Sequence, residues 1–202
     1  MEDALFFIDN AYLKKISTEF NRLYGIKRYD VKKFAKIICE YLRLNCKRIY
    51  FYDAPPYHDS NSENSDLIKL EQYNKFIDSL KRIDIIIREG RCQKVYLFNN
   101  QTQKYYPKYN QKGVDTFLTM DLIIEPTMFN IKNIVLVACD SDFVPVINYL
   151  KECDKKVSLV YYNDHKRGSQ FAVSNEIEST CDFKLLLKQE HFLKSEYKKT
   201  IH

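Results

Sequence analysis

The stretch that most constrains the fold runs from Ile134 to Leu150 and reads IVLVACDSDFVPVINYL. Its first part, Ile134 to Cys139, is apolar and rich in β-branched residues, which is typical of a buried strand. After Asp140-Ser141-Asp142 the spacing becomes helical, and the apolar positions are Phe143, Val146, Ile147 and Leu150. Two carboxylates therefore lie where a core strand gives way to a helix, at the edge of a sheet where ligands usually bind in α/β proteins.

The same change from an apolar strand to a carboxylate occurs near the start of the chain. Residues Ala4 to Ile8 are apolar and end at Asp9-Asn10, and the next segment again has helical spacing. Two more runs, Lys47–Ala54 and Lys156–Tyr161, read as strands. Because strands and helices alternate, the sequence predicts an α/β fold with a mostly parallel sheet and helices on both faces.

The remaining elements follow from spacing and from turn residues. After a polar loop over Pro55–Ser65, the pattern predicts further helices, a hairpin and a final strand or turn. The helices are Val31–Leu44, Leu67–Ile87, Val114–Glu125 ended by Pro126, and Ser169–Glu178; the hairpin pairs Lys94–Phe98 with Lys104–Tyr106; the last strand or turn is Phe183–Leu187. We expect one domain over residues 1–187 and a basic C-terminal tail over residues 188–202.

Composition excludes some classes of protein. With 202 residues and 45% hydrophobic content the chain can bury a substantial core. A formal net charge of +5 is compatible with an acidic polymer as partner. Six cysteines without a CxxC pair argue against zinc and favour a cytoplasmic location with reduced thiols. The short apolar run before Asp9 predicts neither a signal peptide nor a membrane span.

The carboxylates could form a metal site. If the strands at Ala4 and Ile134 are neighbours, Asp9 meets Asp140 and Asp142, and Asp115, at a helix start after Gly113, could reach the same crevice. Clustered carboxylates repel unless a cation neutralises them, and Mg²⁺ or Mn²⁺ prefers such oxygen ligands. Such a site can activate a water for attack on phosphorus, so the reaction class is phosphodiester hydrolysis.

Each acid also has a purely structural interpretation. Asp9, Asp140 and Asp142 are good helix N-cap residues, and Asp115 would be stabilised at a helix start. Taken singly, each motif is most simply a cap, and it is their joint occurrence that favours a site. Asp121 follows Asp115 by six residues, about a third of a turn off its face, so we rank it below the other four.

Three segments together resemble the NYN domain family, the LabA-like branch of the PIN-like ribonuclease superfamily. They read LFFIDNAYL, QKGVDTFLTMDL and VACDSDFVPVINYLKE, and the resemblance extends from about Phe6 to Phe183. It implies a Rossmann-like, PIN-like sheet and a metal-dependent ribonuclease. Matched to the family motifs, Asp9, Asp115, Asp140 and Asp142 are the catalytic, metal-binding acids, with Ser141 beside them. Family members commonly have Gly where this chain has Asn10 and Cys139, but all four acids are in place.

RNA is the expected partner, and the contacts we predict for it lie around the acids. Asn10 and Ser141 adjoin the acids, and Lys112 could meet a phosphate as a point charge, although it could equally be a solvated loop lysine. Nearby basic and aromatic residues suit single-stranded or structured RNA: Lys104, Tyr105, Tyr106, Lys108 and Tyr109. A catalytically silent RNA-binding or scaffold protein and a small-molecule phosphohydrolase stay as alternatives, and a homo-oligomer stays open.

Overall fold

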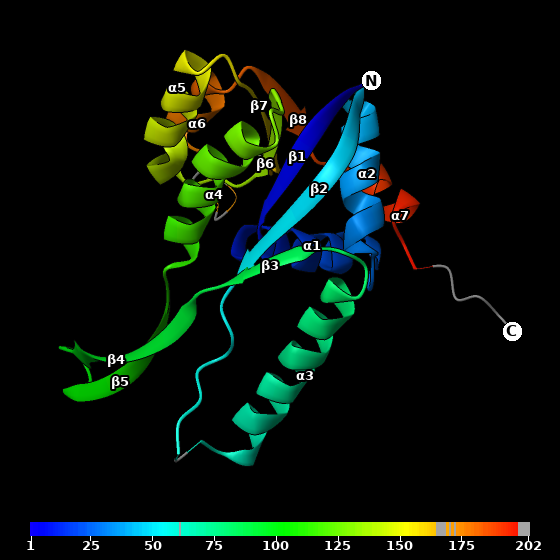
Figure 1. The fold of residues 1–202 in the computed structure, drawn as a ribbon. Coiled ribbons are helices and arrows are strands. Elements are labelled where there is room, and N and C mark those ends of the chain that lie inside the picture. The colour runs from blue at the N-terminus through cyan, green and yellow to red at the C-terminus, as the bar shows by residue number, and fades with distance from the viewer. Residues whose placement is uncertain (61, 165–168, 170, 172, 198–202) are drawn as a thin grey trace, which may run out of the picture.

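The computed structural model describes residues 1–60, 62–164, 169, 171 and 173–197, and Figure 1 shows an α/β fold. Its centre is a six-stranded sheet in which every neighbouring pair of strands is parallel. The order across the sheet is β3-β2-β1-β6-β7-β8. The strands are β1 (Glu2–Asp9), β2 (Leu44–Asp53), β3 (Ile86–Glu89), β6 (Asn133–Val137), β7 (Lys156–Tyr161) and β8 (Phe183–Leu186). The predicted α/β class with a parallel sheet is confirmed.

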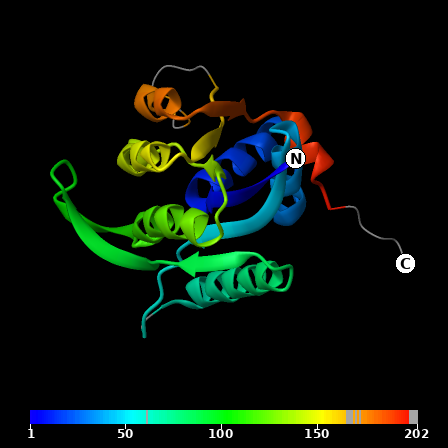
Figure 2. The ribbon, with the colours of Figure 1, turned by 45° about the horizontal axis from the view of Figure 1, so that its top comes forward.

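Helices cover both faces of this sheet (Figure 2). Successive side chains of a strand point to opposite faces, so Phe6 and Ile8 join one apolar cluster and Leu5 and Phe7 join the other. One cluster is covered by α1 (Asn10–Tyr24), α2 (Val31–Tyr41), α3 (Asn64–Lys81) and α7 (Gln189–Lys194), and the other by α4 (Val114–Met128), α5 (Val144–Glu152) and α6 (Asn175–Thr180). The core therefore consists of two layers, one on each side of the sheet.

The strand order reverses between β1 and β6. From β1 the chain moves outward through β2 to β3, and it later returns to place β6 on the other side of β1. The two strands are in register from Ala4 opposite Asn133 to Ile8 opposite Val137. Their carboxyl ends therefore open onto a topological switch point, the usual place for a ligand in this architecture.

A long antiparallel ribbon projects from the body of the fold (Figure 1). It consists of β4 (Arg91–Asn99) and β5 (Lys104–Lys112), which pair over their whole length. At the tip, the Asn99 carboxamide oxygen accepts hydrogen bonds from the backbone N–H groups of Gln101 and Thr102, a typical Asx turn. The predicted hairpin is confirmed, and it is longer than the sequence indicated.

Two predicted helices end early, and in both cases a strand takes the residues that follow. The helix predicted to reach Leu44 ends at Tyr41, and the one predicted to reach Ile87 ends at Lys81. Arg43 and Asp84 have φ values of 58° and 61°, which stop the helices and turn the chain. The apolar residues beyond these turns fit helical spacing by chance, and for this reason the sequence did not predict β3.

Other boundaries also differ from the prediction. Helix α4 continues through Pro126 to Met128, where Pro126 is buried and Glu125 still accepts the N–H of Phe129. In the segment Ser169–Glu178, residues 170 and 172 lie outside the described part, and α6 begins only at Asn175. Strand β6 stops at Val137, before the predicted Cys139. Within the described ranges, no helix is long and apolar enough to cross a membrane.

Part of the predicted basic tail packs against the core. Helix α7 contacts α2, and the buried Phe192 ring lies 5.1 Å from the Phe34 ring and 4.9 Å from the Phe20 ring, measured between centroids. Residues 198–202 of the tail lie outside the described residues. The division of the chain at residue 187 stays a prediction.

Candidate active site

Asp9 lies at the last position of β1 and caps α1. Its Oδ1 atom accepts hydrogen bonds from the backbone N–H groups of Ala11 at 2.9 Å and Tyr12 at 3.4 Å. Burial, together with the smaller effect of the nearby Asp115 charge, raises the pKa of this carboxyl to about 6 although both hydrogen bonds act against it. Asp9 is thus both the predicted cap and a carboxylate held at energetic cost in its charged form.

Asp140 and Asp142 follow β6 across the switch point. Asp140 caps a single 3-10 turn, Ser141–Phe143, and its Oδ1 atom accepts the backbone N–H of Asp142 at 3.0 Å. Both carboxylates are exposed. Cys139 before them is half-buried, and burial followed by the charge of Asp9 raises the pKa of its thiol to about 11. The cysteine therefore adds a neutral group beside Asp9 at neutral pH.

Asp115 reaches the same region from the first turn of α4. Gly113, which precedes the helix, has a φ of 84°, a conformation that glycine adopts without steric cost. Burial raises the pKa of Asp115, and so do the charges of Asp140 and Asp142. Electrostatic repulsion therefore links acids from three elements: β1, α4 and the segment after β6.

The charge of Lys15 acts weakly on Asp9, but the four acids otherwise differ from ordinary surface carboxylates in lacking salt bridges within the described residues. In the part of the chain that the structure describes, none of them takes part in an ion pair. In the same part, no three His, Cys, Asp or Glu side chains are spaced to hold one metal ion between them. The four acids are a group of mutually repelling carboxylates that do not converge on a single point.

Asp53 is a further strand-end acid, and we did not include it among the predicted site residues. It ends β2 next to Asp9, is buried, and accepts hydrogen bonds from Asn10 Nδ2 at 2.6 Å and Gln111 Nε2 at 3.2 Å. Its backbone oxygen also accepts the N–H of Gly90 at 2.8 Å. Asp53 therefore fixes the start of α1 and the base of the ribbon relative to each other. The sequence signal was present, because the strand ends in a carboxylate as β1 does.

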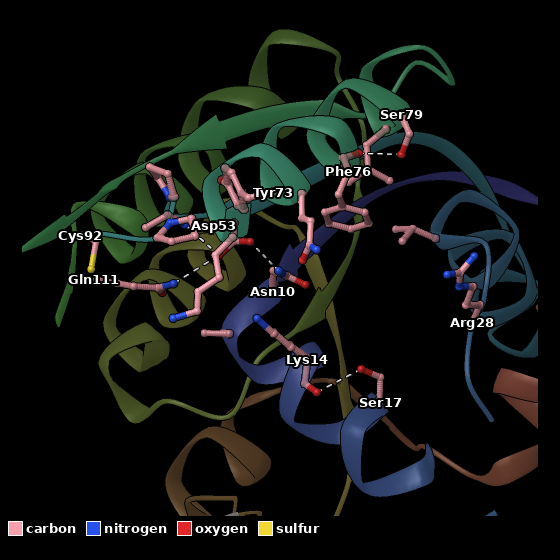
Figure 3. A pocket seen from close by; sticks show the side chains of 18 of the residues that line it. Asn10, Lys14, Ser17, Arg28, Asp53, Tyr73, Phe76, Ser79, Cys92 and Gln111 are labelled. Carbon is pink, nitrogen blue, oxygen red and sulfur yellow. Dashed lines mark hydrogen bonds between the residues drawn. The ribbon is translucent and has the colours of Figure 1, made fainter. Parts of the chain in front are cut away.

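A cavity of about 860 Å³ lies on the α1 side, lined by Asn10, which follows Asp9, and by Asp53, but by none of the four predicted acids (Figure 3). Asn10, Asp53 and Gln111 form one wall, and Tyr73 and Phe76 of α3 lie opposite Lys14 of α1. Further cations line it, namely Lys27, Arg28 and Lys69. A cavity lined in part by cations and aromatic rings is suited to an anionic ligand with aromatic groups.

Sequence comparison identifies the family. The family model of the NYN domain matches residues 5–184 of the chain. The chain belongs to the NYN domain family. The NYN domain is a PIN-like nuclease fold, so the family resemblance seen in the sequence is confirmed.

A solved structure shares the fold of this NYN domain. The chain is similar to a protein of unknown function from Vibrio parahaemolyticus, with a TM-score of 0.53 and 15% sequence identity. The match covers 93% of each chain. At this identity the similarity concerns the fold alone. Among curated proteins, none matches the chain by sequence.

Three other predicted site residues lie near the acids in the sequence: Ser141, Lys112 and Asn10. Ser141 begins the 3-10 turn between Asp140 and Asp142 and is half-buried. Lys112 is exposed at the end of β5, opposite Arg91 in the ribbon and three residues before Asp115. Asn10 lines the cavity, but its amide nitrogen is occupied by Asp53. Of the three, only Asn10 lines the cavity.

Asp121 has a different role in the NYN domain. It is buried, and its Oδ2 atom accepts hydrogen bonds from Tyr52 Oη and from Arg88 Nε, each at 2.8 Å. One turn later, Glu125 accepts the Tyr50 hydroxyl at 2.6 Å and lies 3.6 Å from Arg88. Asp121 therefore belongs to a satisfied structural network, in keeping with its lower rank.

Proposed function

We propose that this NYN domain is a metal-dependent endoribonuclease that hydrolyses RNA phosphodiester bonds at the crevice between β1 and β6. The observation that carries the proposal is the set of unpaired acids at the switch point: Asp9, Asp115, Asp140 and Asp142. Burial and mutual repulsion raise the pKa of Asp9 and Asp115. A site that keeps carboxylates ionised at such cost is typical of function rather than of stability alone.

The residues present fit a hard divalent cation. All four candidate ligands are carboxylates, the donors that Mg²⁺ and Mn²⁺ prefer, and Mg²⁺ commonly takes only one or two carboxylates with waters and phosphate oxygens. This agrees with a crevice in which no three described acids converge on one point. We propose Asp9 and Asp140 as the main ligands, with Asp115 and Asp142 beside them. When bound, the ion would supply charge neutralisation at phosphate and a more acidic water.

The protein's own groups would orient the substrate. Asp9 is held by its two cap bonds, so its carboxylate is fixed without side-chain rearrangement. Lys14 lines the cavity beside Asn10 and Asp53, and Lys112 is exposed three residues before Asp115, so both would meet phosphates of the substrate. Ser141 and Asn10 would contact the substrate at the rim of the crevice. A homo-oligomer and a cytoplasmic location stay predictions.

The test is an Asp140→Asn variant assayed on labelled single-stranded RNA with Mn²⁺. We expect cleavage to be lost while the fold is retained, because Asn keeps the size and can still cap the turn. Asp154→Asn is the matched control, since Asp154 is an exposed acid paired with Lys132 at 2.7 Å. Full activity of Asp140→Asn would reject the site.

The alternatives predict other results. Tight RNA binding that is unaffected by EDTA, with no cleavage under any divalent ion, would assign the chain as a silent RNA-binding module. Hydrolysis of free nucleotides in preference to RNA would assign a small-molecule phosphohydrolase. Each result is obtained with the wild-type protein alone.

A further inference from the structure

The β4–β5 ribbon contains the whole excess positive charge of the chain. The sequence has 32 Lys and Arg against 27 Asp and Glu. Residues Arg91 to Lys112 include five of these cations and no acid, so the rest of the chain is balanced at 27 of each sign. The cations are Arg91, Lys94, Lys104, Lys108 and Lys112. An element with this charge attracts a polyanion at the range of the Debye length, about 8 to 10 Å.

The pairing of the ribbon sorts its side chains onto two faces. Residues directly opposite each other project to the same side, and successive residues alternate. The register pairs Lys94 with Tyr109, Tyr96 with Pro107 and Phe98 with Tyr105. We call the face formed by Lys94, Tyr96, Phe98, Tyr105 and Tyr109 the aromatic face. Tyr106 projects from the opposite face, where it pairs with Leu97.

Contacts between the rings support this assignment. The Phe98 and Tyr105 rings lie 5.1 Å apart between centroids. The Lys94 ammonium lies 5.4 Å from the centre of the Tyr96 ring and 5.6 Å from that of Tyr57. Tyr96 is 60% exposed and Tyr105 is 70% exposed. Large rings held at this exposure, with a cation among them, form a surface on which bases can stack.

The aromatic face continues the wall of the cavity. Tyr109 lines the cavity, and so do Cys92 and Gln111, a cross-strand pair on the same face of the ribbon. Asp53 fixes this end of the ribbon through Gln111 and Gly90. A Cβ atom at Gly90 would lie only 2.5 Å from the Lys112 backbone oxygen, so the backbone just before β4 packs closely against the end of β5. The aromatic face and the cavity are therefore one surface with a fixed orientation.

We propose that the aromatic face binds single-stranded RNA outside the crevice and extends the substrate site along the ribbon. This rests on the proposed ribonuclease function, since it assigns the path of that substrate. Nine paired positions at about 3.4 Å each give the ribbon a length of about 30 Å, enough for several nucleotides. Bases stack on the rings, and Lys94 on the same face meets a phosphate. The other four cations, Arg91, Lys104, Lys108 and Lys112, project from the opposite face with Tyr106, so they attract the polyanion at longer range. The specificity implied is for unpaired RNA without a preferred sequence, because every base has a face that can stack.

The test compares two neighbouring tyrosines on opposite faces. Tyr105→Ala removes a ring of the aromatic face, and Tyr106→Ala is the matched control at 46% exposure. Binding of a fluorescent RNA of about twenty uridines is measured by anisotropy in EDTA, so that no cleavage occurs. We expect Tyr105→Ala to raise the Kd about fivefold or more, and Tyr106→Ala to change it less than about twofold. Tyr96→Ala is a second variant of the same face, and circular dichroism checks that each variant is folded.

Salt dependence gives an independent measurement. For single strands, the slope of log K against log salt falls by about 0.7 for each phosphate contact that is lost. We expect Lys94→Gln to reduce the slope by about this amount. A four-nucleotide RNA, too short to occupy the cavity and the ribbon together, should bind wild type and Tyr105→Ala equally.

Several results would overturn the proposal. Equal losses in Tyr105→Ala and Tyr106→Ala, no loss in either Tyr105→Ala or Tyr96→Ala, or no RNA binding by wild type would each reject the aromatic face. A dimer that Tyr105→Ala dissociates, with RNA binding unchanged, would make the ribbon a self-association arm instead. Binding that depends on Tyr105 without any cleavage would reject the nuclease and keep the ribbon. Cleavage that depends on Asp140, with RNA binding that does not depend on Tyr105, would keep the nuclease and reject the aromatic face.

Discussion

The acids at the two ends of helix α4 differ in their surroundings. Asp121 and Glu125, in its second half, accept hydrogen bonds from two buried tyrosines and lie beside Arg88. Asp115, in its first turn, has no ion-pair partner among the described residues, and the neighbouring acids Asp140 and Asp142 raise its pKa. The first set stabilises the fold, whereas Asp115 has no such partner in the described fold and is the acid that we propose for the metal site.

The comparison shows why counting acids does not locate a site. Asp121 is more buried than Asp115, and by burial alone it would be the better candidate. What separates them is whether the carboxylate has its partners within the fold. The distinction can be tested by substituting an acid of each kind and measuring both cleavage and stability.

The largest expected effect is on catalysis. Asp115→Asn should lower the rate of RNA cleavage by about a thousandfold, because several kcal/mol of charge stabilisation would be lost with the ligand. Its free energy of unfolding should change by less than about 0.5 kcal/mol, as for a surface substitution. Single-turnover cleavage and urea denaturation measure the two quantities. A large loss of stability would place Asp115 in the same class as Asp121.

The next largest effect should be on stability, with cleavage nearly unchanged. Asp121→Ala leaves the buried Tyr52 hydroxyl without its acceptor and removes the ion pair to Arg88. We expect the free energy of unfolding to fall by about 2 kcal/mol. Urea denaturation checks it, with Asp154→Asn as the control. Cleavage measured well below the unfolding transition should stay within a few fold of wild type.

Asp9→Asn should stabilise the metal-free protein, by a smaller amount. The pKa of Asp9 is raised to about 6 in the folded state, against about 3.9 in an unfolded chain. Between these values the folded protein binds more protons, so the wild type loses stability as the pH rises from about 4 to 6 and then levels off. Asn keeps the cap but does not titrate. We expect a gain of about 1 to 2 kcal/mol above pH 6 that vanishes below pH 4, measured by urea denaturation in EDTA.

The smallest effect concerns Lys112. An exposed lysine that meets a phosphate contributes up to about 1 kcal/mol, so Lys112→Gln should raise the KM for RNA by no more than about fivefold. The kcat and the stability should stay as they are. Steady-state cleavage at two salt concentrations checks this, since the difference should shrink at high salt. A loss of kcat would show that Lys112 acts in the chemical step and not only in attracting the substrate.

The sequence was most informative where a buried strand ends in an acid. Alternation predicted the parallel sheet, whereas the adjacency of β1 and β6 was only a condition of the predicted site. The structure meets that condition and brings Asp9 and Asp140 to the same switch point. Asp53 showed the same pattern, but its role depends on Asn10 and Gln111, which are distant in sequence. Strand β3 was missed because its apolar residues continued the helical spacing of α3. No local pattern could show which acids of α4 have partners, because Tyr50, Tyr52 and Arg88 come from other strands.

The reversed strand order also has a consequence for synthesis of the protein. Strands β1, β2 and β3 can pair while the chain is still being made, but β1 waits for β6, which begins more than a hundred residues later. Closing so long a loop is entropically unfavourable and slow compared with local pairing. The acids of the crevice are therefore brought together only late in translation. A ribosome-bound N-terminal half would contain Asp9 and could pair β1 with β2, but it would lack β6 and the Asp140 and Asp142 carboxylates that follow it.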